Sequence, residues 1–220
     1  MKKVKYIIPV IISILIASCG GEVRNPAEIS GALTPGEKPE NAVVKNIDAD
    51  KTTVAWIGSK MVGSAHDGKI GVKSGELYLV DDVLVGGKIV IDMTKIVVLD
   101  IENPAMNARL KGHLESDDFF SVEKFPEAHF DMAQISQIEA AADGLPNFQI
   151  KGNLTIKGIT HGIFFPAYVK VQDGKLTAKA DFSFDRSLFD VRFGSGKFFE
   201  NLGDNLINDE IRVGLDVVAE

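Results

Sequence analysis

Residues 110–130 read L-K-G-H-L-E-S-D-D-F-F-S-V-E-K-F-P-E-A-H-F. They combine the end of an amphipathic helix, an acidic turn at 116–118, four phenylalanines and a Lys-Phe-Pro entry into a strand. On both sides of this segment, apolar and polar residues alternate with the period of two that indicates β-strands. The segment is therefore predicted to be a helical insertion in an otherwise all-β chain.

The chain before the insertion is predicted to form three antiparallel strands, at about residues 52–60, 69–80 and 87–94. The first is rich in β-branched residues and holds the only tryptophan, Trp56. His66-Asp67-Gly68 is expected to form the tight turn that leads into the second strand, because Asp-Gly is a strong turn signal.

The helix is expected at about residues 104–115. Asn103 offers an N-cap, and Pro104 suits the first helical position. Met106, Leu110 and Leu114 recur at helical spacing, so the helix is predicted to lay an apolar face on the sheet.

After the insertion, five more strands are expected, at about residues 126–137, 148–157, 163–171, 175–185 and 211–217, with a long loop at 186–208. Pro166 suits an edge or a bulge in its strand. The short hairpin connections indicate an antiparallel sheet throughout. Eight such strands can form a sandwich or a closed barrel, and the pattern alone leaves both open.

The N-terminal residues are predicted to direct the chain to the cell envelope. Three lysines precede an apolar run at 6–16 that is too short to span a bilayer, and small residues follow it, as in a secretory signal. Ile16-Ala17-Ser18-Cys19 resembles the lipobox of bacterial lipoproteins, which implies a lipid on Cys19. We expect a signal peptide at 1–18, a lipid anchor and flexible tether at 19–46, and a barrel domain at 47–220. Gly20-Gly21 lacks an inner-membrane-retention aspartate and favours the outer membrane.

The charge balance argues against nucleic acid as a partner. Without the signal's three lysines, 21 basic residues stand against 31 acidic ones, so the net charge is about −10. Gly194-Ser195-Gly196-Lys197 lacks the spacing of a phosphate-binding loop, and no nucleophile elbow is present. The sequence predicts no cofactor and no catalytic residue.

Five motifs resemble the YceI-like family and occur in that family's order. They are His66-Asp67-Gly68, the opening segment with S-D-D-F-F and K-F-P-E-A-H-F, G-N-L-T-I-K-G-I-T at 152–160, Asp185-Arg186-Ser187 and Leu202-Gly203-Asp204. The resemblance covers residues 51–219 and departs from the family at Asp190, where a glycine is expected. It implies an eight-stranded antiparallel lipocalin-like β-barrel, with one helix between strands three and four, that binds polyisoprenoid or other long-chain lipids.

The binding hypothesis requires a long apolar surface inside the barrel. The candidates to line it are Trp56, Ile89, Ile91, Phe119, Phe120, Phe130, Phe148, Ile150, Leu154, Phe182 and Phe184. The alternative is that these residues fill a solid core. Phe119, Phe120 and Phe125 either cap the barrel mouth or fasten the helix to the wall. His66 and Arg186 are the candidates to contact a ligand headgroup.

The first functional hypothesis is non-enzymatic binding, storage or transport of a long-chain isoprenoid or fatty amphiphile in the envelope. The alternatives are a metal-dependent hydrolase or envelope-stress enzyme using His66, His129 and Asp131, and a structural module with a solid core. His129 and Asp131 share a strand face without a third ligand, so no metal site is predicted. Membrane contact through Cys19 is expected, and a homodimer is left open.

Overall fold

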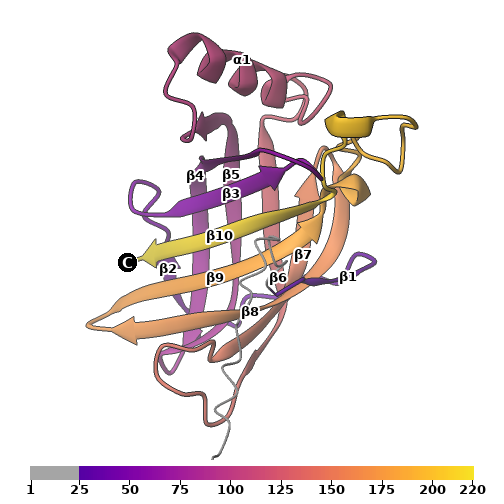
Figure 1. Ribbon diagram of the computed structural model, residues 1–220. Coiled ribbons are helices and arrows are strands. Elements are labelled where there is room, and N and C mark those ends of the chain that lie inside the picture. The colour runs from indigo at the N-terminus through magenta and orange to yellow at the C-terminus, as the bar shows by residue number, and fades with distance from the viewer. Residues whose placement is uncertain (1–24) are drawn as a thin grey trace, which may run out of the picture.

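The computed structural model describes residues 25–220, so the predicted signal peptide and Cys19 lie outside the described residues. The described chain forms ten strands, one α-helix and two short 3-10 helices (Figure 1). Their bounds are β1 Glu28–Ser30, β2 Val43–Asn46, β3 Thr53–Ser59, β4 Ala65–Val80, β5 Val83–Val98, α1 Pro104–Glu115, β6 Glu127–Gln137, β7 Phe148–Ile156, β8 Ile159–Gln172, β9 Lys175–Asp185, η1 Arg186–Phe189, η2 Gly203–Asn205 and β10 Glu210–Ala219.

Strands β3 to β10 form a closed antiparallel barrel. Each pairs with its neighbour in sequence, β10 pairs with β3 and β9, and β8 pairs with β9 to complete the ring. The predicted eight-stranded barrel, with its helix between the third and fourth of these strands, is confirmed. No helix among residues 25–220 is long and apolar enough to cross a membrane.

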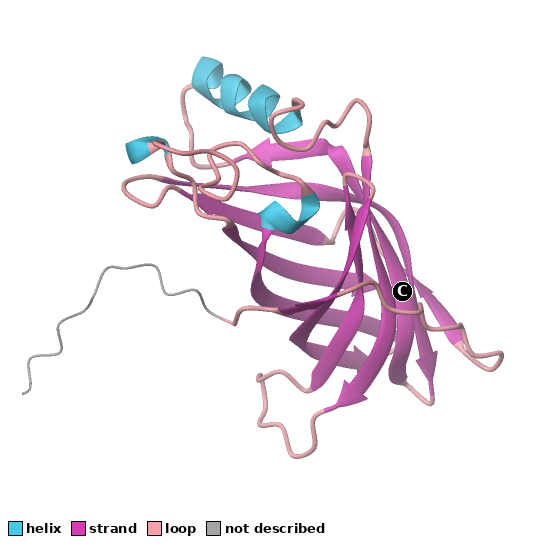
Figure 2. Ribbon diagram, turned by 90° about the vertical axis from the view of Figure 1, so that its right-hand side faces the viewer, coloured by secondary structure: helices cyan, strands magenta, loops and turns pink. Residues whose placement is uncertain are grey.

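The two ends of the barrel differ in what covers them (Figure 2). At one end, here called the helix end, lie α1, the turn at 60–64 and the loop at 186–209. At the other, here called the turn end, lie the hairpin turn at 81–82, the loop at 138–147 and the turn at 173–174. The functional features described below lie toward the helix end.

Helix α1 begins where the sequence predicted. The Asn103 side chain accepts hydrogen bonds from the backbone N–H groups of Ala105 and Met106, and Pro104 occupies the first turn. The predicted apolar face is only partly correct, because Leu114 is buried but Met106 is exposed. The helix lies across the end of the barrel (Figure 1), so only one edge of it meets apolar neighbours.

The motif His66-Asp67-Gly68 lies within β4 and not in a turn, which corrects the prediction. The connection to β3 is the segment at 60–64. The two polar residues bind Asp100 instead: its Oδ1 accepts from the Asp67 N–H at 3.1 Å, and its Oδ2 lies 2.7 Å from the His66 ring. Asp-Gly therefore serves here in strand pairing, which a local turn propensity could not reveal.

Residues 25–46 are not the flexible tether that their proline and glycine content predicted. Residues 25–30, here called the N-terminal strap, lie between β8 and β9. Ile29 is in register with Ile163 of β8, and the Ala27 N–H donates to the Ser183 carbonyl of β9 at 2.9 Å. Farther along, β2 pairs with β4. The proline and glycine content of residues 25–46 wrongly indicated flexibility, because these residues pair with strands that lie far along the chain.

The strap occupies a real gap in the barrel wall. β8 and β9 pair with each other only over Tyr168–Gln172 and Lys175–Lys179, near the turn end. Pro166, just before this pairing begins, has no N–H to donate to a neighbour. Toward the helix end the two strands separate, and the strap supplies the missing hydrogen bonds to both.

Candidate ligand-binding site

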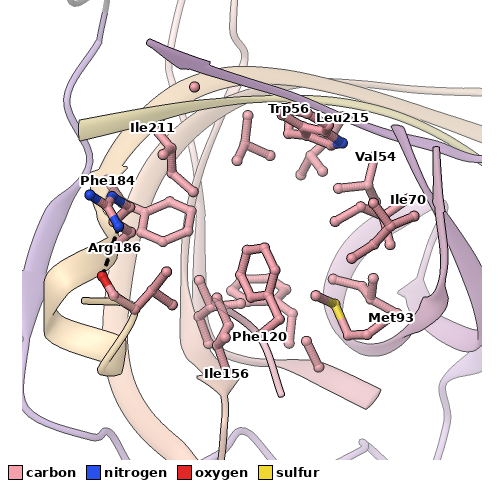
Figure 3. A pocket seen from close by; sticks show the side chains of 18 of the residues that line it. Val54, Trp56, Ile70, Met93, Phe120, Ile156, Phe184, Arg186, Ile211 and Leu215 are labelled. Atoms are coloured by element: carbon pink, nitrogen blue, oxygen red, sulfur yellow. Dashed lines mark hydrogen bonds between the residues drawn. The ribbon is translucent and has the colours of Figure 1, made fainter. Parts of the chain in front are cut away.

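An apolar cavity of about 160 Å³ lies inside the barrel, in the half nearer the helix end. All eight barrel strands and the segment after α1 contribute to its wall. In Figure 3, Arg186 lies at one side of the cavity, and Ile70 and Met93 lie across from it. Only Thr52 and Arg186 among the lining residues carry polar or charged side chains besides the indole of Trp56.

Nine of the eleven predicted lining residues lie in the cavity wall: Trp56, Ile89, Ile91, Phe119, Phe120, Phe130, Leu154, Phe182 and Phe184. The structure does not place Phe148 or Ile150 there. Both are buried in the core toward the turn end, because β7 begins at that end with Phe148. Alternation places a residue on the inner face, but it does not say how far along the barrel that residue lies.

The lining residues that the sequence candidates missed include Ile211, Val213, Leu215 and Val217 of β10. Their strict alternation in the sequence placed them on one face of the strand, and this pattern could have predicted that they line the barrel interior. Ile211 and Leu215 remain half-buried although they face the interior, which reflects the unfilled space beside them.

The other half of the barrel is packed solid. Near the hairpin turn at 81–82, three leucines are almost wholly buried and do not line the cavity: Leu77, Leu79 and Leu84. Leu176 of β9 is also wholly buried and outside the cavity wall. The prediction of a cavity is thus correct for the half toward the helix end, and the alternative of a solid core is correct for the half toward the turn end.

Phe119 both closes the cavity and fastens the helix. It lines the cavity, while its ring contacts His113 of α1 at 5.0 Å and Phe193 of the 186–209 loop at 5.4 Å between centroids. Phe120 lines the cavity beside it. Phe125 lies elsewhere, against the tight turn at Gly158. The two predicted roles therefore coincide at Phe119.

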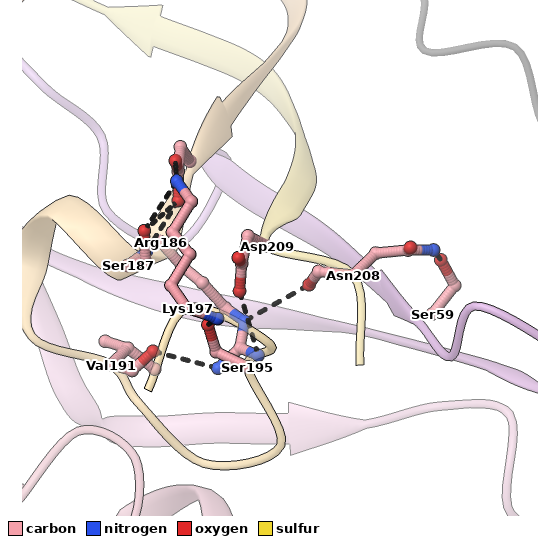
Figure 4. Close-up of polar contacts among 9 residues, drawn as sticks. Ser59, Arg186, Ser187, Val191, Ser195, Lys197, Asn208 and Asp209 are labelled. Atoms are coloured by element: carbon pink, nitrogen blue, oxygen red, sulfur yellow. Dashed lines mark hydrogen bonds and ion pairs between the residues drawn. The ribbon is translucent and has the colours of Figure 1, made fainter. Parts of the chain in front are cut away.

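Arg186 is buried, with 3% of its surface exposed, at the helix end of the cavity (Figure 4). Its Nη1 donates to the Val191 carbonyl at 2.9 Å, and its Nε donates to the Asn208 carbonyl at 3.2 Å. Its Nη2 lies 3.5 Å from Asp209 Oδ1, and both atoms are buried without a hydrogen-bond partner among the described residues. Burial lowers the pKa of Arg186, and the nearby carboxylates of Asp209 and Asp185 oppose that shift.

The loop that carries Arg186 is held by a polar network. The Asp185 carboxylate accepts from the Ser187 N–H at 2.8 Å and pairs with Lys197 (Figure 4). Burial raises the pKa of Asp185, but the hydrogen bonds from Lys197 and Ser187 outweigh it and leave the pKa below its ordinary value. Asp190 adopts the left-handed backbone, with φ of 60°, that glycine would otherwise supply.

The structure does not bring His66 close to His129 and Asp131, the other two residues of the metal-dependent hydrolase alternative. His66 lies outside the cavity wall, paired with Asp100 after the end of β5. His129 is in register with Val90, near the middle of β5, and its closest acidic partner is Glu127 at 3.6 Å. Within residues 25–220, no group of three His, Cys, Asp or Glu side chains lies close enough to hold one metal ion.

A closed antiparallel barrel with an apolar internal cavity defines the class of lipocalin-like barrels. Residues 46–219 match the family model described as the YceI-like domain, and the chain belongs to that family. Comparison with curated protein sequences finds no match.

Solved structures that share the fold include two from other proteins. BcnA of Burkholderia cenocepacia is 20% identical with a TM-score of 0.60, over 79% of this chain and 99% of that one. A polyisoprenoid binding domain from Saccharophagus degradans, implicated in plant cell wall breakdown, is 15% identical with a TM-score of 0.58, over 80% of this chain and 97% of that one.

Proposed function

We propose that this protein encloses a long-chain isoprenoid or a similar amphiphile in its barrel, and stores or transports it without chemical change. The observation that carries the proposal is the cavity, whose wall is almost entirely apolar. Burying apolar surface contributes roughly 25 cal/mol per Å², so a chain that buries several hundred Å² binds tightly without any polar contact. The domain of the same fold from Saccharophagus degradans that is described as polyisoprenoid binding supports this choice of ligand.

The ligand must enlarge the cavity. The present volume is about 160 Å³, whereas pockets for drug-sized ligands run from about 300 to 1,000 Å³. An engineered apolar cavity of about 150 Å³ in another protein binds ligands as small as benzene or xenon. We therefore propose that a long chain displaces the half-buried side chains of Phe120, Ile211 and Leu215, which already border empty space.

Arg186 is the proposed headgroup contact. Among residues 25–220, its Nη2 and the Trp56 Nε1 are the buried donors of the cavity-lining side chains that lack a hydrogen-bond partner, and of these two only Arg186 carries a charge. An unpaired buried N–H is costly, and an oxygen acceptor on a ligand headgroup would satisfy it. His66 is not part of this proposed contact, because its ring pairs with Asp100 outside the cavity.

We further propose that the protein works in the cell envelope, tethered through a lipid on Cys19, with the outer membrane favoured over the inner. This part is supported by the sequence of residues 1–21 alone. A lipid anchor would hold the barrel beside the bilayer in which isoprenoids dissolve.

The test is to purify the protein from its own host, extract it with solvent and identify the released lipid by mass spectrometry. The extracted protein is then titrated with that lipid, with the single Trp56 as the fluorescent reporter in the cavity wall. We expect saturable binding at one site. A protein that is empty on isolation and shows no saturable response would instead be a structural module. Turnover of the lipid would indicate an enzyme.

A further inference from the structure

Exposed apolar side chains gather at the helix end of the barrel. Of the thirteen large apolar side chains that are exposed within residues 25–220, ten lie on or next to this end. The turn at 60–64 presents Met61 and Val62, with 62% and 68% of their surfaces exposed. The 186–209 loop presents Phe193, Phe198 and Phe199. We call these five residues the mouth surface.

The turn end shows the opposite character. Its two hairpin turns consist of Asp81-Asp82 and Asp173-Gly174. Leu145 is the exposed large apolar side chain in its remaining loop, and Val43 and Val85 lie on strands nearby. Exposed loop tips are ordinarily polar, and contiguous apolar patches on a protein surface mark sites of interaction. The asymmetry therefore assigns an interaction to the helix end and not to the barrel as a whole.

The mouth surface is continuous with the cavity. The Met61 N–H donates to the Leu206 carbonyl at 2.9 Å, which joins the two loop tips, and Ile207 beside it lines the cavity. Phe193 contacts Phe119, which also lines the cavity. An apolar molecule at this surface thus lies next to the cavity wall.

The charges around the mouth surface do not favour a charged partner. Arg192 is paired with Asp190, and Lys197 is paired with Asp185. Lys60, Glu200 and Asp204 add one positive and two negative charges, so neither sign dominates near the loop tips. A partner held by electrostatic complementarity would require one sign to prevail. An uncharged apolar partner, such as the interior of a zwitterionic bilayer, fits better.

The position of the strap fits the same partner. The strap begins at Asn25, whose side chain donates to the Asp181 carbonyl of β9, only a few residues before Arg186 at the helix end. The six peptide links between Cys19 and Asn25 span at most about 20 Å. A lipid on Cys19 would therefore lie within about 20 Å of Asn25, on the part of the wall that continues toward the mouth surface.

We propose that the mouth surface inserts into the lipid bilayer, so that an isoprenoid passes from the membrane into the cavity without crossing water. This inference rests on the proposed function and adds where and how the ligand enters. Met61, Val62, Phe198 and Phe199 enter the interfacial region, and the 186–209 loop with Phe119 lies over the cavity entrance.

The test compares two matched sites at opposite ends of the barrel. The full-length protein is placed in zwitterionic phosphatidylcholine vesicles, and single variants Val62→Cys and Leu145→Cys are labelled with bimane. Both native residues are exposed apolar residues in turns. Wild-type protein treated with the same label corrects for any signal from Cys19.

We expect brominated lipids to quench the label at position 62 and to leave the label at 145 unaffected. Quenching should persist at about 0.5 M NaCl, because apolar insertion is not screened by salt. Equal quenching at both positions, or none at 62, would overturn the inference. Shielding of position 62 without vesicles that grows with protein concentration would assign the surface to a second copy of the chain and also overturn it.

A functional readout uses the double variant Met61→Ser/Val62→Ser, with Leu145→Ser as its control. The double variant should take up isoprenoid from vesicles at least about tenfold more slowly, because membrane binding scales with the apolar area inserted, with its equilibrium affinity unchanged. An unchanged uptake rate would refute bilayer docking. If the wild-type protein itself binds no isoprenoid saturably, the proposed function fails first, so the two failures are distinguishable.

Discussion

Gly68 lies beneath the indole of Trp56, which is part of the cavity wall. A methyl group at this position would overlap the Val97 carbonyl oxygen and lie 2.5 Å from the Trp56 ring carbon Cζ2. Only a glycine allows the ring to pack this closely on the strand. The sequence motif that predicted a turn is thus explained by a close approach between β3 and β4.

We predict that Gly68→Ala lowers the free energy of unfolding by about 1–3 kcal/mol, because overpacking forces the ring or the strand to move. Gly58→Ala is the matched control on β3, since a methyl group there meets nothing within 4 Å; it should change stability by less than about 0.5 kcal/mol. Urea denaturation followed by Trp56 fluorescence measures both. Equal stability of the two variants would contradict the packing argument.

Other motif residues also serve the architecture. Gly152 leaves room for the ring of Phe130, since a methyl group there would lie 2.6 Å from Phe130 Cζ. Asn153 exchanges two hydrogen bonds of 2.8 Å with the backbone of Leu33. Lys157 and Gly158 both have positive φ, as a two-residue hairpin requires. The motifs that carry the family resemblance therefore mark how the barrel is built more than where a ligand binds.

Asp185 gives the loop beside the cavity a pH dependence. Its pKa in the folded protein lies below the ordinary value of 3.8, so the folded state binds fewer protons than the unfolded chain. Its stabilising contribution is present above the unfolded-state pKa and is lost as the pH falls through the folded-state pKa. We predict that thermal melts of wild type and Asp185→Asn differ most near neutral pH and converge as the pH falls through the folded-state pKa of Asp185, which lies below 3.8. A difference that stays constant with pH would show that the Asp185 charge is not involved.

At the scale of elements, the strap is a part of the barrel wall that makes few buried contacts. β1 has three residues, of which only Ile29 is partly buried, against the barrel core. Segments with few buried contacts open first. Opening of the strap would expose the edges of β8 and β9 where they do not pair with each other.

We predict that Ile29→Ser lowers the free energy of unfolding by about 1 kcal/mol, because it removes half-buried apolar surface. Hydrogen exchange should accelerate in β8 at 159–165 and in β9 at 180–184, and not in β5. Glu28→Ser is the control, because Glu28 is exposed on the same strand. Unchanged exchange in β8 and β9 would mean that the strap does not hold the wall together.

At the scale of the whole molecule, the barrel divides into a packed half and a hollow half. The packed half, around Leu77, Leu79 and Phe148, supplies a core that does not depend on ligand. The hollow half leaves Ile211 and Leu215 only partly covered. Such a division lets the fold remain stable while its cavity fills and empties.

We predict that Leu215→Trp reduces isoprenoid affinity at least about tenfold, a loss of about 1.4 kcal/mol, because the larger ring occupies the cavity. Asp216→Trp is the matched control, since Asp216 is the next residue of β10 and is exposed. Titration of both variants with the extracted lipid measures the difference. Equal affinities would place the ligand outside the cavity.

The sequence by itself determined the barrel strands, the helix and nine of the twenty-eight residues in the cavity wall, because these follow from local patterns. Alternation identified eight strands and six of the lining residues, the aromatic segment after the helix supplied Phe119 and Phe120, and Asn103-Pro104 set the start of α1. The tertiary structure alone decided the rest. It placed Phe148 and Ile150 in the solid half, gave the strap its place between β8 and β9, put His66 beside Asp100 and buried Arg186 at the cavity end. Each of these outcomes depends on contacts between residues far apart in the chain, and local periodicity carries no information about distant partners.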